Sequence, residues 1–553
     1  MSEILFHYKR PDPATWVYLS SFLTIGLFFV FHRFWSIRNL DIVLLLLLAP
    51  GLLMVHNGRR DEFQARERKA VAEAELPSDL DLSRLSEQTA ALLAAADNSP
   101  PNSATPNSST PNSATPNSAA AEAEAAVLTA LQAAEADSTG SDDARSEGLT
   151  AIGPELTGAL SQRLEAIGAI EGARRLQLRG FVWLLAIQIL ILLRLLLDAA
   201  MVRRPLLAPN LTTGGLFFIG ASLAIFLMAN VIGSTARQQL EQGPELSRAG
   251  YPLMQALPTL PTRTESYESL RPTTVRALPA DTLPADTLPA EAAPGRAGAV
   301  IARILVIAAH VSVLVGIVLI GYRHFGNLRA GAGCALLYLL LPYTAQMTGR
   351  VDHVLPAAML VWAVLMYRRP LVAGIFLGLA AGLVYYPLFL LPLWISFYWQ
   401  RGLKRFNFGV LITIGTLMLL LTLGGWEEFG DRLRQMFGLW LPRSQNLEGV
   451  WGLGWFAIWR LPVLVAFLLL AGFYSIWPAQ KNLGTLISCS ASLMVAAQFW
   501  HGYGGGLYIA WFLPLLLLTI FRPNLEDRVA LKVIGGGSLP SSRRASNSQT
   551  EAA

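Results

Sequence analysis

Long apolar runs recur along this chain, and they constrain its fold more than any other feature. A helix needs about twenty apolar residues to cross the hydrocarbon of a bilayer, and charge in this chain is concentrated at the turns between the runs. With 53% hydrophobic and 15% charged residues, the composition lies outside the range of soluble globular proteins. The sequence therefore predicts an all-α polytopic membrane protein of about 12 to 13 transmembrane helices, surrounded by the lipid bilayer.

Two polar insertions of low complexity divide the apolar runs. They contain the repeats PNSATPNSSTPNSATPNS and LPADTLPADTLPAE, whose composition cannot form a packed core and predicts disorder. An amphipathic helix that lies along the membrane interface is expected over 159–178. The predicted parts are two N-terminal transmembrane helices in 1–56, a largely disordered insertion over 57–178, transmembrane helices 3 and 4 in 179–233, a Pro-rich disordered loop over 234–297, a main transmembrane bundle over 298–522 with an interfacial loop over 425–456, and a disordered tail over 523–553.

Residues 370–399 are too long for one upright transmembrane helix and short for two. Pro387 lies in the middle of this run, where it removes a backbone donor, so we expect a hairpin of two short helices. Gly374, Gly378 and Gly382 are four residues apart on the first arm, a spacing that lets another helix approach closely. The third apolar run carries Arg194 and Asp198 four residues apart, which favours a neutralising pair, with a role on a substrate path as the alternative.

Several classes of function are excluded by what the sequence contains. The basic residues behind the net charge of +5 flank apolar runs rather than gather on a soluble face, so we expect no nucleic acid as a partner. The two cysteines lie inside apolar runs, which indicates neither a disulfide framework nor a thiolate metal site. No phosphate-binding loop and no dinucleotide-binding fingerprint occurs, which disfavours chemistry driven by nucleotides.

The short connections predict which turns share a side of the membrane. The arginines and lysines at 323–329, 368–369 and 401–405 fall at alternate ends of successive runs, and such turns belong in the cytoplasm. Asp352, His353 and His501 then lie on the extracytoplasmic side, as does the loop with Glu427 and Glu428. Tracing back along the chain places Asp61 there too. The expected location is the cytoplasmic (inner) membrane, which the chain crosses many times.

A degenerate pattern runs through about residues 300–400. It consists of Gly349, Arg350, Val351 and Asp352, then Arg369, Pro370, Ala373, Gly374, Gly378 and Ala380, then Tyr386, Pro387 and Pro392. This pattern resembles that of membrane glycosyltransferases of the GT-C fold that use lipid-phosphate-linked sugars, especially glycosyltransferase family 87 and related mannosyltransferase-like proteins. Two positions depart from the family pattern, because Arg350 stands where Gln is usual and Val384 stands where Lys is usual.

The resemblance implies a GT-C-like bundle and a set of site residues. A sugar donor with a lipid phosphate requires a base for the acceptor hydroxyl and cationic groups for the phosphate, on one face of the bilayer. By resemblance, Asp61 is the candidate base with Glu62 as its neighbour, and Asp352 orients the substrate or holds a divalent metal ion. The groups implied in substrate binding are Arg350, His353, Tyr386 and His501.

Four of these residues also have a purely structural interpretation. Asp61 and Glu62 lie among arginines, as in an ordinary solvated charge run. Asp352 suits the cap of a helix over 354–367. His501 lies between Trp500 and glycines, as a structural loop histidine can.

Three functions remain open at this point. The leading one is a hexosyltransferase that moves a sugar from a polyprenyl-phosphate donor to an envelope glycan, lipid or protein on the extracytoplasmic side. The second is a carrier or flippase for a lipid-linked or small anionic substrate, which would keep charges inside the bilayer. The third is an inactive structural relative, in which Val384 reflects lost catalysis.

Overall fold

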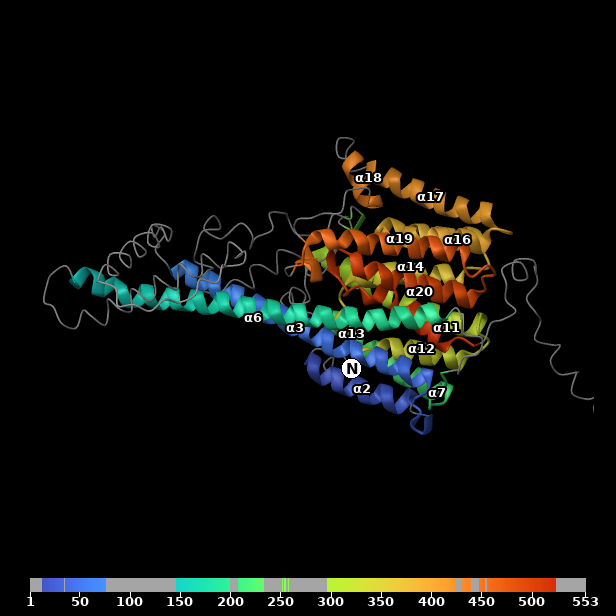
Figure 1. Ribbon diagram of the computed structural model, residues 1–553. Helices are drawn as coiled ribbons and strands as arrows, with labels where there is room; N and C mark the ends of the chain where they lie inside the picture. The colour runs from blue at the N-terminus through green and yellow to red at the C-terminus, as the bar shows by residue number, and fades with distance from the viewer. Residues whose placement is uncertain are drawn as a thin grey trace, which may run out of the picture. The chain divides into compact units, whose positions relative to one another are not determined.

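The computed structural model describes residues 12–33, 35–75, 146–198, 207–232, 251, 253–254, 257, 296–422, 429–438, 447–452 and 455–523. The chain divides into two compact units. The first comprises Met1–Val55, Leu178–Thr262 and Ala293–Ala553, and the second comprises His56–Gln177 and Arg263–Ala292. In Figure 1 the helices labelled α11 to α20 in the first unit run roughly parallel to one another.

The first unit is built mainly from helices. Its longer helices are α2 (Pro13–Phe28), the first part of α3 (Ile37–Glu75), the last part of α6 (Ser146–Asp198), α7 (Thr213–Ile232), α11 (Arg296–Arg323), α12 (Leu328–Leu340), α14 (Val351–Leu365), α15 (Pro370–Leu383), α16 (Leu391–Tyr398), α17 (Leu403–Thr422), α19 (Arg460–Ile476), α20 (Leu483–Trp500) and α21 (Leu513–Phe521). The shorter elements are η1 (Phe31–Arg33), α13 (Pro342–Gln346), η7 (Tyr386–Leu390), α18 (Phe429–Phe437), β1 (Glu448–Gly449), η8 (Val450–Gly452), η9 (Ala457–Trp459), β2 (Tyr503–Gly505) and η10 (Ile509–Trp511).

Six of the described helices are long and apolar enough to cross a membrane, and further apolar helices of 10–17 residues accompany them. Large apolar side chains cover the outside of such helices, as lipid contact requires. Leu411 and Leu419 on α17, for example, are 67% and 68% exposed. The prediction of an all-α polytopic membrane protein is thereby confirmed, whereas the number of crossings and a GT-C-like arrangement stay predictions. The long runs are Ile37–Glu73, Ser161–Asp198, Thr213–Ile232, Val300–Arg323, Leu403–Thr422 and Leu483–Trp500.

The predicted hairpin over 370–399 is present as α15, η7 and α16. α15 ends at Val384, whose backbone is extended, and Pro387 lies in the 3-10 turn that follows. The two arms return to the same end, because the Tyr398 hydroxyl at the end of α16 donates to the carbonyl oxygen of Tyr367 at 2.6 Å. The sequence prediction of two short helices is confirmed.

Glycines let α15 and α17 pack closely. A Cβ on Gly374 would lie 2.3 Å from the carbonyl oxygen of Phe406, and one on Gly409 would lie 2.1 Å from the carbonyl oxygen of Leu371. Side chains at these positions would force the two helices apart. The prediction that the glycine spacing on α15 permits close helix approach is therefore confirmed.

One end of the first unit gathers the basic turns, and we call it the basic end. Hydrogen bonds there join the α14–α15 turn to the end of α16, the α19–α20 turn to α16, and the start of α12 to the segment before α7. Its basic residues are Arg323, Arg329, Arg368, Arg369, Arg401, Lys404, Arg405, Lys481 and Arg522.

The opposite end, which we call the loop end, carries the start of α14, the break after α15 and the turn between α20 and η10. The ring of His353 lies 4.5 Å from that of Tyr508, and Tyr508 lies 4.9 Å from His501. Asp352, His353 and His501 therefore share one end of the unit, as the alternation of basic turns predicted. Glu427 and Glu428 lie outside the described residues.

The second unit corrects the predicted first insertion. Its described residues 56–75 and 146–177 are helical, being parts of α3 and α6. Disorder was expected for 57–75 and 146–158, which are helical, whereas the helix expected over 159–178 is present and is continuous with the third apolar run in α6. The two helical parts are joined by an ion pair between Arg163 and Glu73, whose Nε and Oε1 lie 3.2 Å apart. The repeat at 101–118 and the C-terminal residues 524–553 lie outside the described residues.

Four residues of the second predicted loop, 234–297, pack against the first unit. Tyr251 and Met254 are buried, Leu257 packs against the apolar core, and Leu253 lies beside Gly382. We call these four residues the Tyr251 segment. The prediction of a disordered loop does not hold for them, and most of the loop lies outside the described residues.

Candidate functional site

α14 begins with a buried ion pair at the loop end. Nε of Arg350 lies 3.1 Å from Oδ1 of Asp352 and Nη2 lies 3.0 Å from Oδ2, while the two residues are 3% and 5% exposed. This paired geometry is the strong arrangement of a guanidinium on a carboxylate. The predicted capping role for Asp352 is not what the structure has, because α14 begins at Val351 and Arg350 occupies the cap position.

His353 connects this ion pair to a cluster of rings. Its ring packs on Tyr508, which also contacts His501 and stacks on Trp511 with centroids 4.5 Å apart. The indole N–H of Trp511 donates to the backbone carbonyl oxygen of Asp352 at 3.1 Å. Two segments that are about 150 residues apart in the chain are thus held together by ring packing and one hydrogen bond.

Buried glutamines hold the turn between α20 and η10. Nε2 of Gln188, on α6, donates to the carbonyl oxygen of Gly506 at 2.7 Å, and Oε1 of Gln498 accepts from the backbone N–H of Tyr508 at 3.2 Å. Gly505 must lack a side chain, because a Cβ there would lie 2.6 Å from the carbonyl oxygen of Gln498. The turn is therefore a fixed support for its rings. Its strand β2 pairs in parallel with β1.

Tyr386 joins the cluster from the break in the hairpin. Its ring stacks on His501 with centroids 4.9 Å apart and lies 5.5 Å from Trp511. The Tyr385 hydroxyl donates to the Tyr386 hydroxyl at 3.0 Å, and Tyr251 stacks on Tyr385. Burial raises the pKa of the Tyr251 phenol well above its ordinary value, so this ring is neutral.

Arg460 is a second buried guanidinium at the loop end, and sequence analysis missed it. Nε and Nη2 donate to the carbonyl oxygen of Trp500 at 3.3 and 3.0 Å, and the charge interacts with Tyr385 and Tyr386. A Cβ on Gly502 would lie 2.6 Å from Nη2. In the sequence Arg460 reads as a basic residue flanking an apolar run, so no local signal distinguishes it.

The structure therefore brings five of the seven predicted residues into one place. Arg350, Asp352, His353, Tyr386 and His501 form a connected, buried cluster with Tyr508 and Trp511, which we call the loop-end cluster. Val384, where the resembling family has a lysine, is buried at the end of α15 and supplies no charge.

Asp61 and Glu62 belong to the second unit. Oε1 of Glu62 accepts from Nη2 of Arg66 at 2.7 Å and from Nε of Arg174 at 3.3 Å, and Oε2 accepts from Nε2 of Gln177 at 2.5 Å. Asp61 is close to half exposed and lies beside a neighbouring arginine. These contacts fit a solvated charge run in which the Glu62 carboxylate joins two helices. A catalytic role for Asp61 or Glu62 stays a prediction.

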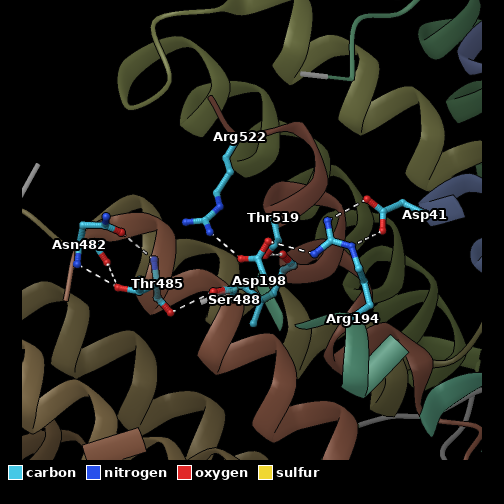
Figure 2. Close-up of polar contacts among 9 residues, drawn as sticks. Asp41, Arg194, Asp198, Asn482, Thr485, Ser488, Thr519 and Arg522 are labelled. Carbon is cyan, nitrogen blue, oxygen red and sulfur yellow. Dashed lines mark hydrogen bonds and ion pairs between the residues drawn. The ribbon is translucent and has the colours of Figure 1, made fainter. Parts of the chain in front are cut away.

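A separate network of buried charges lies at the basic end (Figure 2). Nε and Nη2 of Arg194 lie 2.7 and 3.0 Å from the two carboxylate oxygens of Asp41, and Nη1 lies 3.1 Å from Oδ1 of Asp198. Nη2 of Arg522 lies 2.5 Å from Oδ2 of Asp198, which is fully buried. The predicted pair of Arg194 and Asp198 is confirmed, and it is part of a string of four alternating charges.

Arg522 also lies against the first turn of α20 (Figure 2). A Cβ on Gly484 would lie 1.4 Å from Nη1 of Arg522, so only glycine leaves room for the guanidinium. Asn482 caps the helix beside it by accepting from the backbone N–H of Thr485 at 2.8 Å. The network thus ties α3, α6, α20 and α21 to one another.

Among the described residues, no group of three or more His, Cys, Asp or Glu side chains is placed to hold a metal ion. Comparisons with protein-family profiles, with curated proteins and with solved structures found no match for the chain.

Proposed function

We propose that the protein is an integral membrane glycosyltransferase that moves a sugar from a polyprenyl-phosphate donor to an envelope acceptor at the loop end. One observation carries the proposal. Residues singled out from three separate stretches, around Asp352, Tyr386 and His501, meet in one cluster that combines a carboxylate, cations and aromatic rings. Such a cluster offers the groups that the reaction requires.

In the proposed reaction, the donor phosphate pairs with Arg350 and thereby releases the Asp352 carboxylate. The acceptor hydroxyl oxygen bonds to the anomeric carbon of the sugar as its proton passes to Asp352. The bond from that carbon to the phosphate oxygen breaks, and its electron pair stays on the phosphate. Arg350, with Arg460 nearby in the same end, stabilises the negative charge that remains.

The loop-end cluster is buried, so the donor must enter by local rearrangement at this end. The basic end supports this choice of side, because its turns carry the arginines and lysines that favour the cytoplasm. Polyprenyl-phosphate donors are lipids, and the apolar outer faces of the first unit suit lateral access from the bilayer.

The test is transfer of labelled sugar by the purified full chain in lipid nanodiscs, with a panel of polyprenyl-phosphate sugars. Asp352→Asn should lower turnover by about 10² to 10⁴ because it removes the base. Asp431→Asn, which changes an exposed acid on α18, is the matched control and should keep full activity. Asp61→Asn, tested beside them, decides whether the predicted base in the second unit takes part.

Protein yield and gel-filtration behaviour are measured for each variant, since a misfolded protein would imitate a catalytic defect. If well-folded protein transfers sugar from none of the donors, the proposal is contradicted. Full activity of Asp352→Asn at normal yield would leave the enzyme class standing and remove Asp352 from the reaction.

A carrier for a lipid-linked or small anionic substrate is the second candidate, and the four-charge network favours it. Buried charges within membrane helices often mark a substrate path. Asp198→Asn should then lower the movement of substrate across reconstituted liposomes by more than its loss of folded protein accounts for, so transport is normalised to the amount of folded protein. The network lies at the basic end rather than midway along the helices, so we rank this function below the transferase.

A further inference from the structure

We propose that Tyr385 and Tyr386 form a subsite for a sugar ring, and that Tyr251 occupies this subsite as an internal stand-in until a saccharide displaces it. The inference rests on the proposed function, because it names the place where that function would hold its sugar. It concerns a segment of the second polar insertion that plays no part in the proposed chemistry.

The three tyrosines form a continuous stack. The rings of Tyr251 and Tyr385 have centroids 5.7 Å apart and planes inclined by 23°, and those of Tyr385 and Tyr386 have centroids 4.4 Å apart and planes inclined by 27°. Tyr386 continues the stack to His501. Tyr251 therefore stacks on Tyr385, which in turn stacks on Tyr386 of the loop-end cluster.

The chemistry of this pile suits a pyranose. A sugar ring has an apolar C–H face and a rim of hydroxyl groups, and a tyrosine offers an apolar face with a hydroxyl at its edge. Once Tyr251 is displaced, the ring face of Tyr385 becomes available for stacking. The hydroxyls of Tyr385 and Tyr386, which are hydrogen-bonded to each other, can exchange hydrogen bonds with the hydroxyl groups of the sugar. Arg460 supplies a cation near the same two rings, as a phosphate attached to the sugar requires.

Tyr251 belongs to a covering segment rather than to the helical bundle. Leu257 of the segment packs against an apolar cluster of Val231, Ala302, Val306 and Val351, the last of which begins α14. Leu253 approaches Gly382 near the end of α15. The segment thus packs on the tyrosine stack and on an apolar cluster that includes the first residue of α14.

The contacts that seat the segment can be exchanged for those of a ligand. They include the ring stack, hydrogen bonding of the Tyr251 hydroxyl with the hydroxyls of Tyr385 and Tyr386, apolar packing of Met254 and Leu257, and a backbone hydrogen bond from Leu257 to Met254 at 3.3 Å. An aromatic pair contributes about 0.5 to 1.5 kcal/mol beyond its burial, so its loss alone changes an equilibrium by about two- to ten-fold. A saccharide that stacks on Tyr385 in its place can therefore shift the segment.

The experiment reports the position of the segment directly. Met254→Cys is introduced into the full chain in nanodiscs, and its rate of reaction with a bulky thiol reagent is measured. Met254 is 2% exposed, so the docked segment should protect the thiol, and the native Cys334 and Cys489 are themselves buried. Leu257→Cys is a second reporter in case the first disturbs folding.

Addition of polyprenyl-phosphate mannose should raise the labelling rate about two- to ten-fold, whereas polyprenyl phosphate without sugar should not. Tyr251→Ala should raise labelling without ligand and tighten binding of the sugar donor by a similar factor. Tyr251→Phe keeps the ring but removes the hydroxyl, so its labelling without ligand should lie between that of the parent and that of Tyr251→Ala. Tyr322→Ala, which removes an exposed tyrosine at the basic end, is the control and should change nothing.

The proposal is overturned if the bound sugar donor leaves labelling unchanged, if polyprenyl phosphate alone has the same effect as the donor, or if no variant binds the donor. Its failure is separable from that of the proposed function. If the protein transfers sugar while the segment stays in place, the proposed role of Tyr251 is rejected and the proposed transferase function is kept. If sugar displaces the segment but no transfer occurs, the sugar subsite is kept and the transferase function is rejected.

Discussion

At the scale of single residues, the buried network of Asp41, Arg194, Asp198 and Arg522 allows a quantitative prediction about stability. Removing one partner of a buried pair leaves an uncompensated charge, which costs about 3 to 5 kcal/mol. Arg522→Gln should lower the free energy of unfolding by about that amount, because Asp198 loses its contact at 2.5 Å. Unfolding in mixed detergent micelles measures the change.

A double variant separates charge from packing in this experiment. Asp198→Asn combined with Arg522→Gln leaves Arg194 with Asp41, so the remaining network is neutral. The double variant should therefore lose less than the sum of the two single losses. Arg434→Gln breaks an exposed ion pair with Asp431 and should cost less than about 1 kcal/mol. Additive losses in the double variant would contradict the role given to Arg522.

Local spacing could reveal only part of this network from the sequence. Arg194 and Asp198 are four residues apart, so helical geometry places them on one face. Asp41 and Arg522 are 153 and 324 residues away from their partners, and no local rule connects them. The same holds for Trp511, which bonds to Asp352 across 159 residues and links stretches that the sequence had singled out separately.

At the scale of helices, the α15–α17 contact depends on glycine. Gly374→Ala places a Cβ 2.3 Å from a backbone carbonyl oxygen of α17, which cannot yield as a side chain would. We expect a loss of about 1 to 3 kcal/mol in the free energy of unfolding through overpacking. Gly415→Ala, on α17 with open space around its Cβ position, is the matched control and should be neutral or stabilising by up to about 1 kcal/mol.

Equal stability of the two alanine variants would contradict this account of the packing.

The length of the apolar run and the glycine spacing were enough to predict the hairpin and its close neighbour. The helical residues 57–75 were missed because they are rich in charge and lack an apolar run. Their helix is joined to 161–177 by side chains such as Glu62 and Arg174, a pairing that neither segment displays by itself.

At the scale of the whole molecule, the two ends of the first unit predict its orientation. We expect the basic end in the cytoplasm, so a cysteine at Asp431 should react with an impermeant thiol reagent in intact spheroplasts and one at Lys404 only after lysis. Both native side chains are exposed, which keeps the reagent from being blocked. Val351, although at the loop end, is buried and unsuitable for labelling. The reverse labelling pattern would invert the orientation and move the proposed chemistry to the cytoplasm.

The arrangement of the ends was accessible from sequence because positive charge recurs at every second turn. The Tyr251 segment was not, since a tyrosine and three apolar residues within a Pro-rich stretch carry no periodicity. Its packing depends on Tyr385 and on an apolar cluster that includes Ala302 and Val351, all of which lie far along the chain. The candidate site residues were thus predicted from separate stretches of the sequence. Only the tertiary structure shows that five of them form one cluster.

The string of four charges also sets an order of events during synthesis. Asp41, Arg194 and Asp198 are made first, and until Arg522 follows they hold one more negative than positive charge. Asp198 and Arg522 are 324 residues apart, which at ordinary rates of translation is an interval of about 15 to 65 s. Throughout that interval the nascent chain carries a carboxylate without its second arginine in an apolar setting. We therefore expect the packing around Asp198 to be completed only when α21 and Arg522 are in place, so that a chain ending before residue 522 should be less stable than the full chain.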